Sequence, residues 1–257
     1  MDKKDDGHTP ERDLIIGRNA VQEALRAGRL LDTVYIKRSS GGGKGGSMSA
    51  ILAKAKQQDL VIKEVDSKKL DRMCGGANHQ GIAAVAALKA YAQLDDLFAL
   101  AENRGEPPFF IILDEISDPY NLGAILRTAE CAGAHGVIVP KRHSAPLSYA
   151  VGKASAGAVE YVPVARVVNL TNTIEMLKKR GVWIYAADME GSLFCAVDYR
   201  GPLALVIGSE GAGISRLVKD HADFVISLPM HGKIRSLNAS VAAGVICYEV
   251  AKQRSSD

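Results

Sequence analysis

The spacing of apolar positions in the first third of the chain predicts a small α/β unit. Ala20, Val21, Ala24 and Leu25 fall on one side of a helix that Gly28 would end. Strand-like and helical patterns then follow one another as far as residue 88. The predicted strands are 32–37, 61–66 and 81–88, and the predicted helices are 18–27, 48–58 and 67–73.

The remainder of the chain alternates strands and helices more regularly. Several of its strands are continuously apolar, such as FFIIL, GVIV and LALVI, which is typical of strands covered on both faces. This pattern predicts a parallel sheet wrapped by helices, an α/β fold. The predicted strands are 109–114, 136–140, 159–165, 182–187, 203–208 and 223–228, and the predicted helices are 122–132, 148–156, 170–180, 214–221 and 238–253.

Changes in composition divide the chain into four segments. Residues 1–12 are polar without periodicity, which predicts a disordered tail. A smaller N-terminal domain at 13–88 is followed by a linker at 89–108 and a larger C-terminal domain at 109–257. Within the first domain, the stretch SSGGGKGGS (39–47) predicts a flexible loop.

Composition and charge narrow the class of protein. The chain of 257 residues has no long uncharged apolar run and begins with a charged segment, so neither a membrane span nor a secretory signal is expected. Its four cysteines form no C-x-x-C pair, which favours a reducing cytoplasm over disulfides or a zinc ribbon. Residues 1–90 hold 16 Lys/Arg against 11 Asp/Glu, which fits either an anionic polymer partner or a solvated surface.

Three loops at predicted strand ends carry the candidate chemistry, because open parallel sheets bind ligands there. The first is NLGAILR (121–127), where Asn121 either caps a helix or contacts a ligand. Arg127 either pairs with Glu130 or reaches toward an anion, over an approach that Gly123 and Ala124 keep free of side chains.

The second loop is LVIGSEGAGIS (205–215). Its glycines would let backbone groups approach a ligand closely, although an ordinary strand-to-helix connection has the same form. A carboxylate at Glu210 would repel a pyrophosphate, so a neutral or cationic ligand portion suits this loop better.

The third loop is ISLPMHGKIRSLNAS (226–240), in which a strand ends at Leu228-Pro229 and a long loop precedes the last helix. Either Ser236 or Asn238 can cap that helix. The helix is apolar nearly all round, so we expect it to be buried inside the domain or against a partner subunit.

The stretches NLGAILRTAE, LVIGSEGAGIS and SLPMHGKIRSLNASVA resemble, in this order, the three motifs of the SpoU/TrmH-type (SPOUT superfamily) RNA ribose 2′-O-methyltransferases. IIGRNAVQEAL (15–25) and NHQGIAA (78–84) resemble the N-terminal part of the enzymes that modify guanosine in 23S (large-subunit) rRNA. The resemblance implies a trefoil-knotted C-terminal domain, an L30e-like RNA-binding N-terminal domain, S-adenosyl-L-methionine as cofactor, and a homodimer formed through the C-terminal domain.

The same resemblance implies roles for individual residues. Arg127, Asn121, Glu210 and Asn238 would be catalytic, and the cofactor would contact Gly208, Glu210, Gly211, Leu228, Pro229, Met230, Ser236, Leu237 and Asn238. Arginine is permanently charged in proteins, and making Arg127 neutral near pH 7 so that it acts as a base would cost roughly 8 kcal/mol. We therefore expect it to bind an RNA phosphate and stabilise the 2′-alkoxide. No metal is expected, because no His/Cys/Asp cluster has ligand spacing.

Other functions remain open at this level. A nicotinamide-dependent dehydrogenase would need a G-x-G-x-x-G fingerprint, which the chain lacks. A knotted methyltransferase acting on a tRNA ribose or on a base nitrogen, and a non-catalytic RNA-binding protein of the same fold, are closer alternatives.

Overall fold

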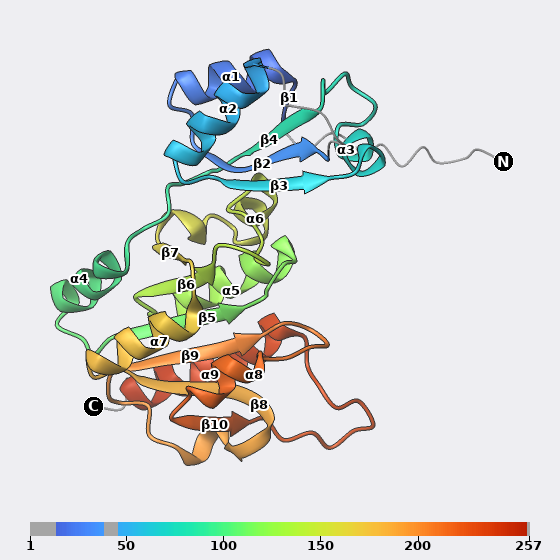
Figure 1. Ribbon diagram of the computed structural model, residues 1–257. Helices are drawn as coiled ribbons and strands as arrows, with labels where there is room; N and C mark the ends of the chain where they lie inside the picture. Colours follow the sequence, from blue (N-terminus) through green and yellow to red (C-terminus); the bar gives the residue numbers. More distant parts are fainter. Residues whose placement is uncertain (1–13, 39–45, 256–257) are drawn as a thin grey trace. The chain divides into compact units, whose positions relative to one another are not determined.

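The computed structural model describes residues 14–38 and 46–255 (Figure 1). These residues form two compact units. The first lies within residues 1–90 and also includes 146–149, and the second lies within residues 91–145 and 150–257. The predicted tail at 1–12 and residues 39–45 of the glycine-rich loop lie outside the described residues.

The first unit is built on a four-stranded mixed sheet in the order β1-β4-β2-β3. Strand β4 (Ile82–Ala86) pairs antiparallel with β1 (Leu14–Ile16) and β2 (Leu31–Lys37), and β3 (Val61–Val65) lies parallel to β2. Helices α1 (Arg18–Arg26) and α2 (Gly46–Gln57) bury Val21, Leu25 and Ile51 in one cluster with the sheet, and α3 (Ser67–Met73) buries Leu70 in a second. The unit therefore has a helical layer on each side of its sheet.

The second unit contains the six-stranded parallel sheet that the apolar runs predict, in the order β10-β8-β9-β5-β6-β7. Its central strands β5 and β9 are almost wholly buried, as continuous apolar runs require. The strands are β5 (Phe109–Asp114), β6 (Gly136–Pro140), β7 (Val164–Val167), β8 (Trp183–Leu193), β9 (Leu203–Gly208) and β10 (Phe224–Ser227). The helices of this part of the chain are α4 (Leu94–Arg104), α5 (Pro119–Cys131), α6 (Tyr149–Ala154), α7 (Leu170–Lys179), α8 (Arg216–Asp220) and α9 (Ala239–Arg254).

Two segments differ from their sequence-based predictions. The predicted strand at 159–165 is a 3-10 turn, Ala158–Glu160, followed by the later strand β7, because Pro163 interrupts the apolar run. Helix α4 occupies most of the segment expected to be a linker. Its Leu97 is fully buried and its Phe98 ring lies edge-on to Phe110 at 4.9 Å, so it is part of the core of the second unit.

The end of helix α9 is fixed by Arg254. Its guanidinium donates to the backbone oxygens of Pro107, Pro108, Tyr199 and Gly201 at 2.7–3.2 Å. The helix also packs along α5, with Gly244 close to Thr128. The C-terminal end of α9 is thus tied to the segments that lead into the central strands β5 and β9. No helix among residues 14–38 and 46–255 combines the length and the apolar character that crossing a membrane requires.

Candidate active site

The three motif loops leave the same edge of the parallel sheet. The first follows β5 and the second follows β9, and these two strands are hydrogen-bonded neighbours with Asp114 opposite Gly208. The third follows β10 and runs as a long loop to the start of α9 (Figure 1). The sheet therefore brings the ends of β5 and β9 into contact, and the third loop must return from the sheet edge to reach them.

Asp118, rather than Asn121, caps helix α5. The Asp118 carboxylate accepts a hydrogen bond from the Asn121 backbone N–H at 3.0 Å, and Pro119 is the first helical residue. The interpretation of Asn121 as a helix cap is therefore wrong. Its side chain, in a residue only 8% exposed, is available for other contacts.

One hydrogen-bond network joins a side chain from each of the three loops. The Asn121 amide donates to the Glu210 carboxylate at 3.1 Å, and the Asn238 amide donates to the Asn121 side-chain oxygen at 2.9 Å. The Asn238 amide also donates to Glu210. Glu210 thus accepts from both asparagines, and the three residues fix one another's orientation.

Asn238 links this network to the backbone of α9. Its side-chain oxygen accepts from the Ser240 and Val241 backbone N–H groups at 2.9 and 3.3 Å, which is an N-cap. Of the two predicted caps for this helix, Asn238 is confirmed and Ser236 is not. One side chain therefore caps the helix with its oxygen and joins the network with its nitrogen.

The glycines of the second loop shape the loop itself. Ser209 and Gly213 exchange two backbone hydrogen bonds of 2.9 and 3.1 Å, and Gly211 and Gly213 have positive φ angles of 93° and 69°. A Cβ on Gly208 would lie 2.2 Å from the Gly213 carbonyl carbon. The absence of a side chain at Gly208 is therefore required by the returning loop, whatever ligand binds there.

The sequence suggested that Gly123 keeps the approach over the first loop free of side chains, but the structure gives this glycine a different role. It is buried, and a Cβ there would lie 2.4 Å from the Ala154 Cβ of α6. Arg127 is exposed and forms no ion pair with Glu130. Within the described residues its guanidinium has no partner, so the structure joins three of the four predicted catalytic residues and leaves the arginine apart.

The predicted cofactor residues provide two kinds of surface. Glu210 supplies a carboxylate, and the third loop exposes apolar side chains at Met230 and Leu237, which are 38% and 42% exposed. Leu228 is half-buried, whereas Pro229 and Ser236 are exposed. A carboxylate in the second loop and accessible apolar side chains in the third fit S-adenosylmethionine, which combines a cationic sulfonium with an adenine ring.

Two carboxylates that position the motifs were not predicted from the sequence. Asp118 holds Asn121 in the first turn of α5, and Asp114 accepts from the Ser215 backbone N–H at 2.7 Å, which ties the end of β5 to the second loop. The Asp-Pro pair at 118–119 is a helix-start signal that could have identified the first. Among the described residues, no group of three His, Cys, Asp or Glu side chains could hold a metal ion.

Two family models match the chain, one on each unit. The model described as the SpoU rRNA Methylase family matches residues 108–248, and the model described as RNA 2′-O ribose methyltransferase substrate binding matches residues 14–92. The chain is 49% identical over 245 residues to YacO of Bacillus subtilis (strain 168), which is named as a TrmH family tRNA/rRNA methyltransferase. That match covers 95% of this chain and 97% of YacO.

Solved structures match over nearly the same length. AviRb, a SpoU methyltransferase of Streptomyces viridochromogenes in complex with the cofactor AdoMet, is 25% identical with a TM-score of 0.60, covering 95% of this chain and 91% of that one. An AdoMet-bound rRNA methyltransferase of Sinorhizobium meliloti is 26% identical with a TM-score of 0.57, covering 93% and 87%. Both matches extend over the two units described above.

Proposed function

Because the chain belongs to the SpoU/TrmH family of S-adenosylmethionine-dependent RNA ribose 2′-O-methyltransferases, we propose that it methylates a guanosine ribose in 23S rRNA. IIGRNAVQEAL and NHQGIAA in the first unit support this substrate through their likeness to enzymes of that specificity. The S. meliloti relative, named for rRNA, supports it further because it matches both units. A tRNA ribose is the alternative.

Glu210, Met230 and Leu237 are the residues that would hold the cofactor, together with the backbone of the 208–213 and 228–238 loops. When bound, the cofactor supplies an electrophilic methyl group on its sulfonium. Glu210 also anchors the Asn121 and Asn238 amides, so its carboxylate is oriented before any ligand arrives. This pre-orientation is the observation that carries the proposal, because catalysis depends on groups that need little reorganisation.

Arg127 would act on the RNA side of the reaction. An arginine stays charged at neutral pH, and this guanidinium has no partner among the described residues, so it can bind a phosphate with two parallel hydrogen bonds. The same charge would stabilise the 2′-oxygen as it loses its proton to water. Asn121 would orient the ribose or the arginine.

Helix α9 supports the expected homodimer. Its exposed side carries Val241, Val245 and Tyr248, which are 50%, 40% and 57% exposed and lie one and two turns apart. Such an apolar stripe is typical of a subunit contact. The four cysteines are all free, as an rRNA-modifying enzyme of the cytoplasm would have them.

The test is methylation of 23S rRNA and tRNA transcripts, followed by mapping of 2′-O-methyl groups. We expect a single guanosine of 23S rRNA to be modified, and modification of tRNA alone would contradict the substrate assignment. Arg127→Lys should lower kcat by about 10²–10³, as removal of a transition-state donor does elsewhere. Arg200→Lys, an exposed arginine paired with Asp198, is the matched control and should be unchanged. Substantial activity in Arg127→Lys would contradict a two-bond guanidinium contact.

A further inference from the structure

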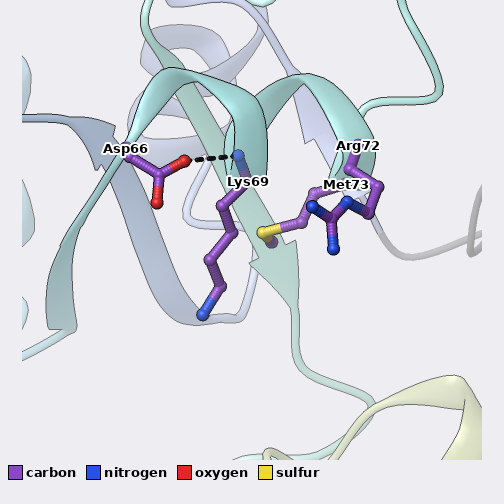
Figure 2. Close-up of a pocket in the computed structure, with 4 residues that line it drawn as sticks. All are labelled: Asp66, Lys69, Arg72 and Met73. Atoms are coloured by element: carbon purple, nitrogen blue, oxygen red, sulfur yellow. Dashed lines mark hydrogen bonds between the residues drawn. The ribbon is translucent and has the colours of Figure 1, made fainter.

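A cavity in the first unit has chemistry that the methyl-transfer site does not use. It has a volume of about 470 Å³ and is lined by Asp66, Lys69, Arg72 and Met73, at helix α3. Figure 2 shows Lys69 and Arg72 extending from the helix with the Met73 sulfur between them.

Two acidic residues, Asp66 in the cavity lining and Asp71 in α3, accept hydrogen bonds from other groups of this unit. Asp66 caps α3 by accepting from the Lys69 backbone N–H at 2.7 Å. Asp71 pairs with His79 Nε2 at 2.8 Å, and the other ring nitrogen of His79 accepts from the Gly81 N–H. These bonds hold α3 against the loop that precedes β4, so the cavity wall is fixed.

The charged groups of the basic residues at this cavity have no partner among the described residues. Across 14–38 and 46–255, the Lys69 ammonium and the Arg72 guanidinium form no hydrogen bond or ion pair with another residue. The same holds for the side chains of Lys37 and Arg38 at the end of β2. The Arg38 backbone N–H bonds to the Val65 oxygen, one residue before Asp66, so these charges lie at the same end of the sheet. These four cations outnumber the carboxylates of Asp66 and Asp71, and a surplus of positive charge attracts an anionic partner.

The spacing of the lining residues suits one nucleotide. Lys69, Arg72 and Met73 are three and four residues apart and share one face of α3. Lysine and arginine bind phosphate oxygens, and a thioether is a soft surface for an aromatic ring. Bases of RNA become available to such a surface where the strand is unpaired.

We propose that this cavity binds an unpaired nucleotide of the RNA substrate, with Lys69 and Arg72 on its phosphates and Met73 against its base. The proposal rests on the proposed function for the identity of the RNA. It adds a binding subsite, built from α3, for the RNA that the methyl-transfer domain modifies.

The test measures binding without turnover, using labelled RNA with an unpaired loop and a fully paired duplex of the same stem. Lys69→Gln/Arg72→Gln should weaken binding of the looped RNA at least about tenfold and reduce the salt dependence, d log K/d log [salt], by about 1.4, or 0.7 for each phosphate contact. Met73→Ala should weaken binding of the looped RNA while leaving the salt dependence unchanged. Both variants should lose the preference for the loop over the duplex.

Lys54→Gln/Lys56→Gln is the matched control. It removes the same charge at the end of α2, which leads into the start of β3 at the opposite end of the sheet. Equal weakening by the control would show a diffuse charge effect and overturn the proposal, as would unchanged binding in the α3 variant. A wild-type protein that binds the looped RNA but methylates no rRNA would contradict the proposed function instead, and the cavity result would stand.

Discussion

Substitution of Gly123 by alanine separates two explanations for a glycine in the first motif. The structure places this glycine where α5 packs against the C-terminal end of α6. An added Cβ would lie 2.4 Å from the Ala154 Cβ and 2.9 Å from both the Ser155 nitrogen and the Val151 oxygen. Two of these three neighbours are backbone atoms, which cannot turn aside as the end of a flexible side chain could.

The expected cost follows from these distances. Overpacking of a core costs about 1–3 kcal/mol, and the upper part of this range applies because backbone must move. Alanine regains about 1 kcal/mol of helix propensity over glycine. The net loss of about 2 kcal/mol should lower the unfolding temperature by roughly 4–8 °C for a domain of this size.

Thermal unfolding followed by calorimetry measures this shift. Gly244→Ala in α9 is the control, because the atom nearest to an added Cβ there is the Thr128 hydroxyl oxygen at 4.0 Å. This change should leave stability unchanged or raise it slightly. If Gly123→Ala unfolds at the wild-type temperature but no longer methylates RNA, the glycine is needed to leave space for the ligand, and the packing explanation is refuted.

Two further predictions concern stability and assembly. Burial lowers the pKa of His135, whose Nδ1 accepts a hydrogen bond from the Phe109 N–H. Below about pH 6.5 this histidine therefore takes up a proton more readily in the unfolded chain than in the folded one. The free energy of unfolding should fall as the pH drops through that range. Denaturant titrations at several pH values should show a weaker decline in His135→Gln, and an identical decline would contradict the assignment. Tyr248→Glu should shift the protein to a monomer in sedimentation experiments, because it places a charge in the exposed stripe of α9. Lys179→Glu, an exposed charge change in α7, should sediment as wild type, and a dimeric Tyr248→Glu would exclude the α9 stripe as the contact.

Much of the fold is readable from the periodicity of the sequence. Strands β5 and β9 stand out because strands buried on both faces need continuous apolar runs. Strand β1 was missed because its three residues are too few to show a period. The segment of helix α4 is helix-prone at LDDLFALA (94–101) but was assigned to a linker, because its Gln93–Asp96 capping box is a weaker signal than the two prolines that follow it.

The site is less readable, because its contacts are long-range. Asn121 meets Glu210 across 89 residues and Asn238 across 117, and no local pattern encodes such distances. The family resemblance identified these three residues as site residues but did not predict the hydrogen bonds between them. Gly123 illustrates a further limit on sequence-based prediction. A glycine required by the close packing of a neighbouring helix and a glycine required by a ligand look alike in the sequence.

The Asn121–Glu210–Asn238 network has a consequence for the protein during its synthesis. A polypeptide growing on the ribosome carries the first two residues well before the third, and Arg254, which fastens α9 to Pro107 and Gly201, emerges later still. Until then Glu210 has only one of its two amide donors, and α9 has no anchor. The three side chains therefore cannot assemble until the chain as far as Asn238 has left the ribosome.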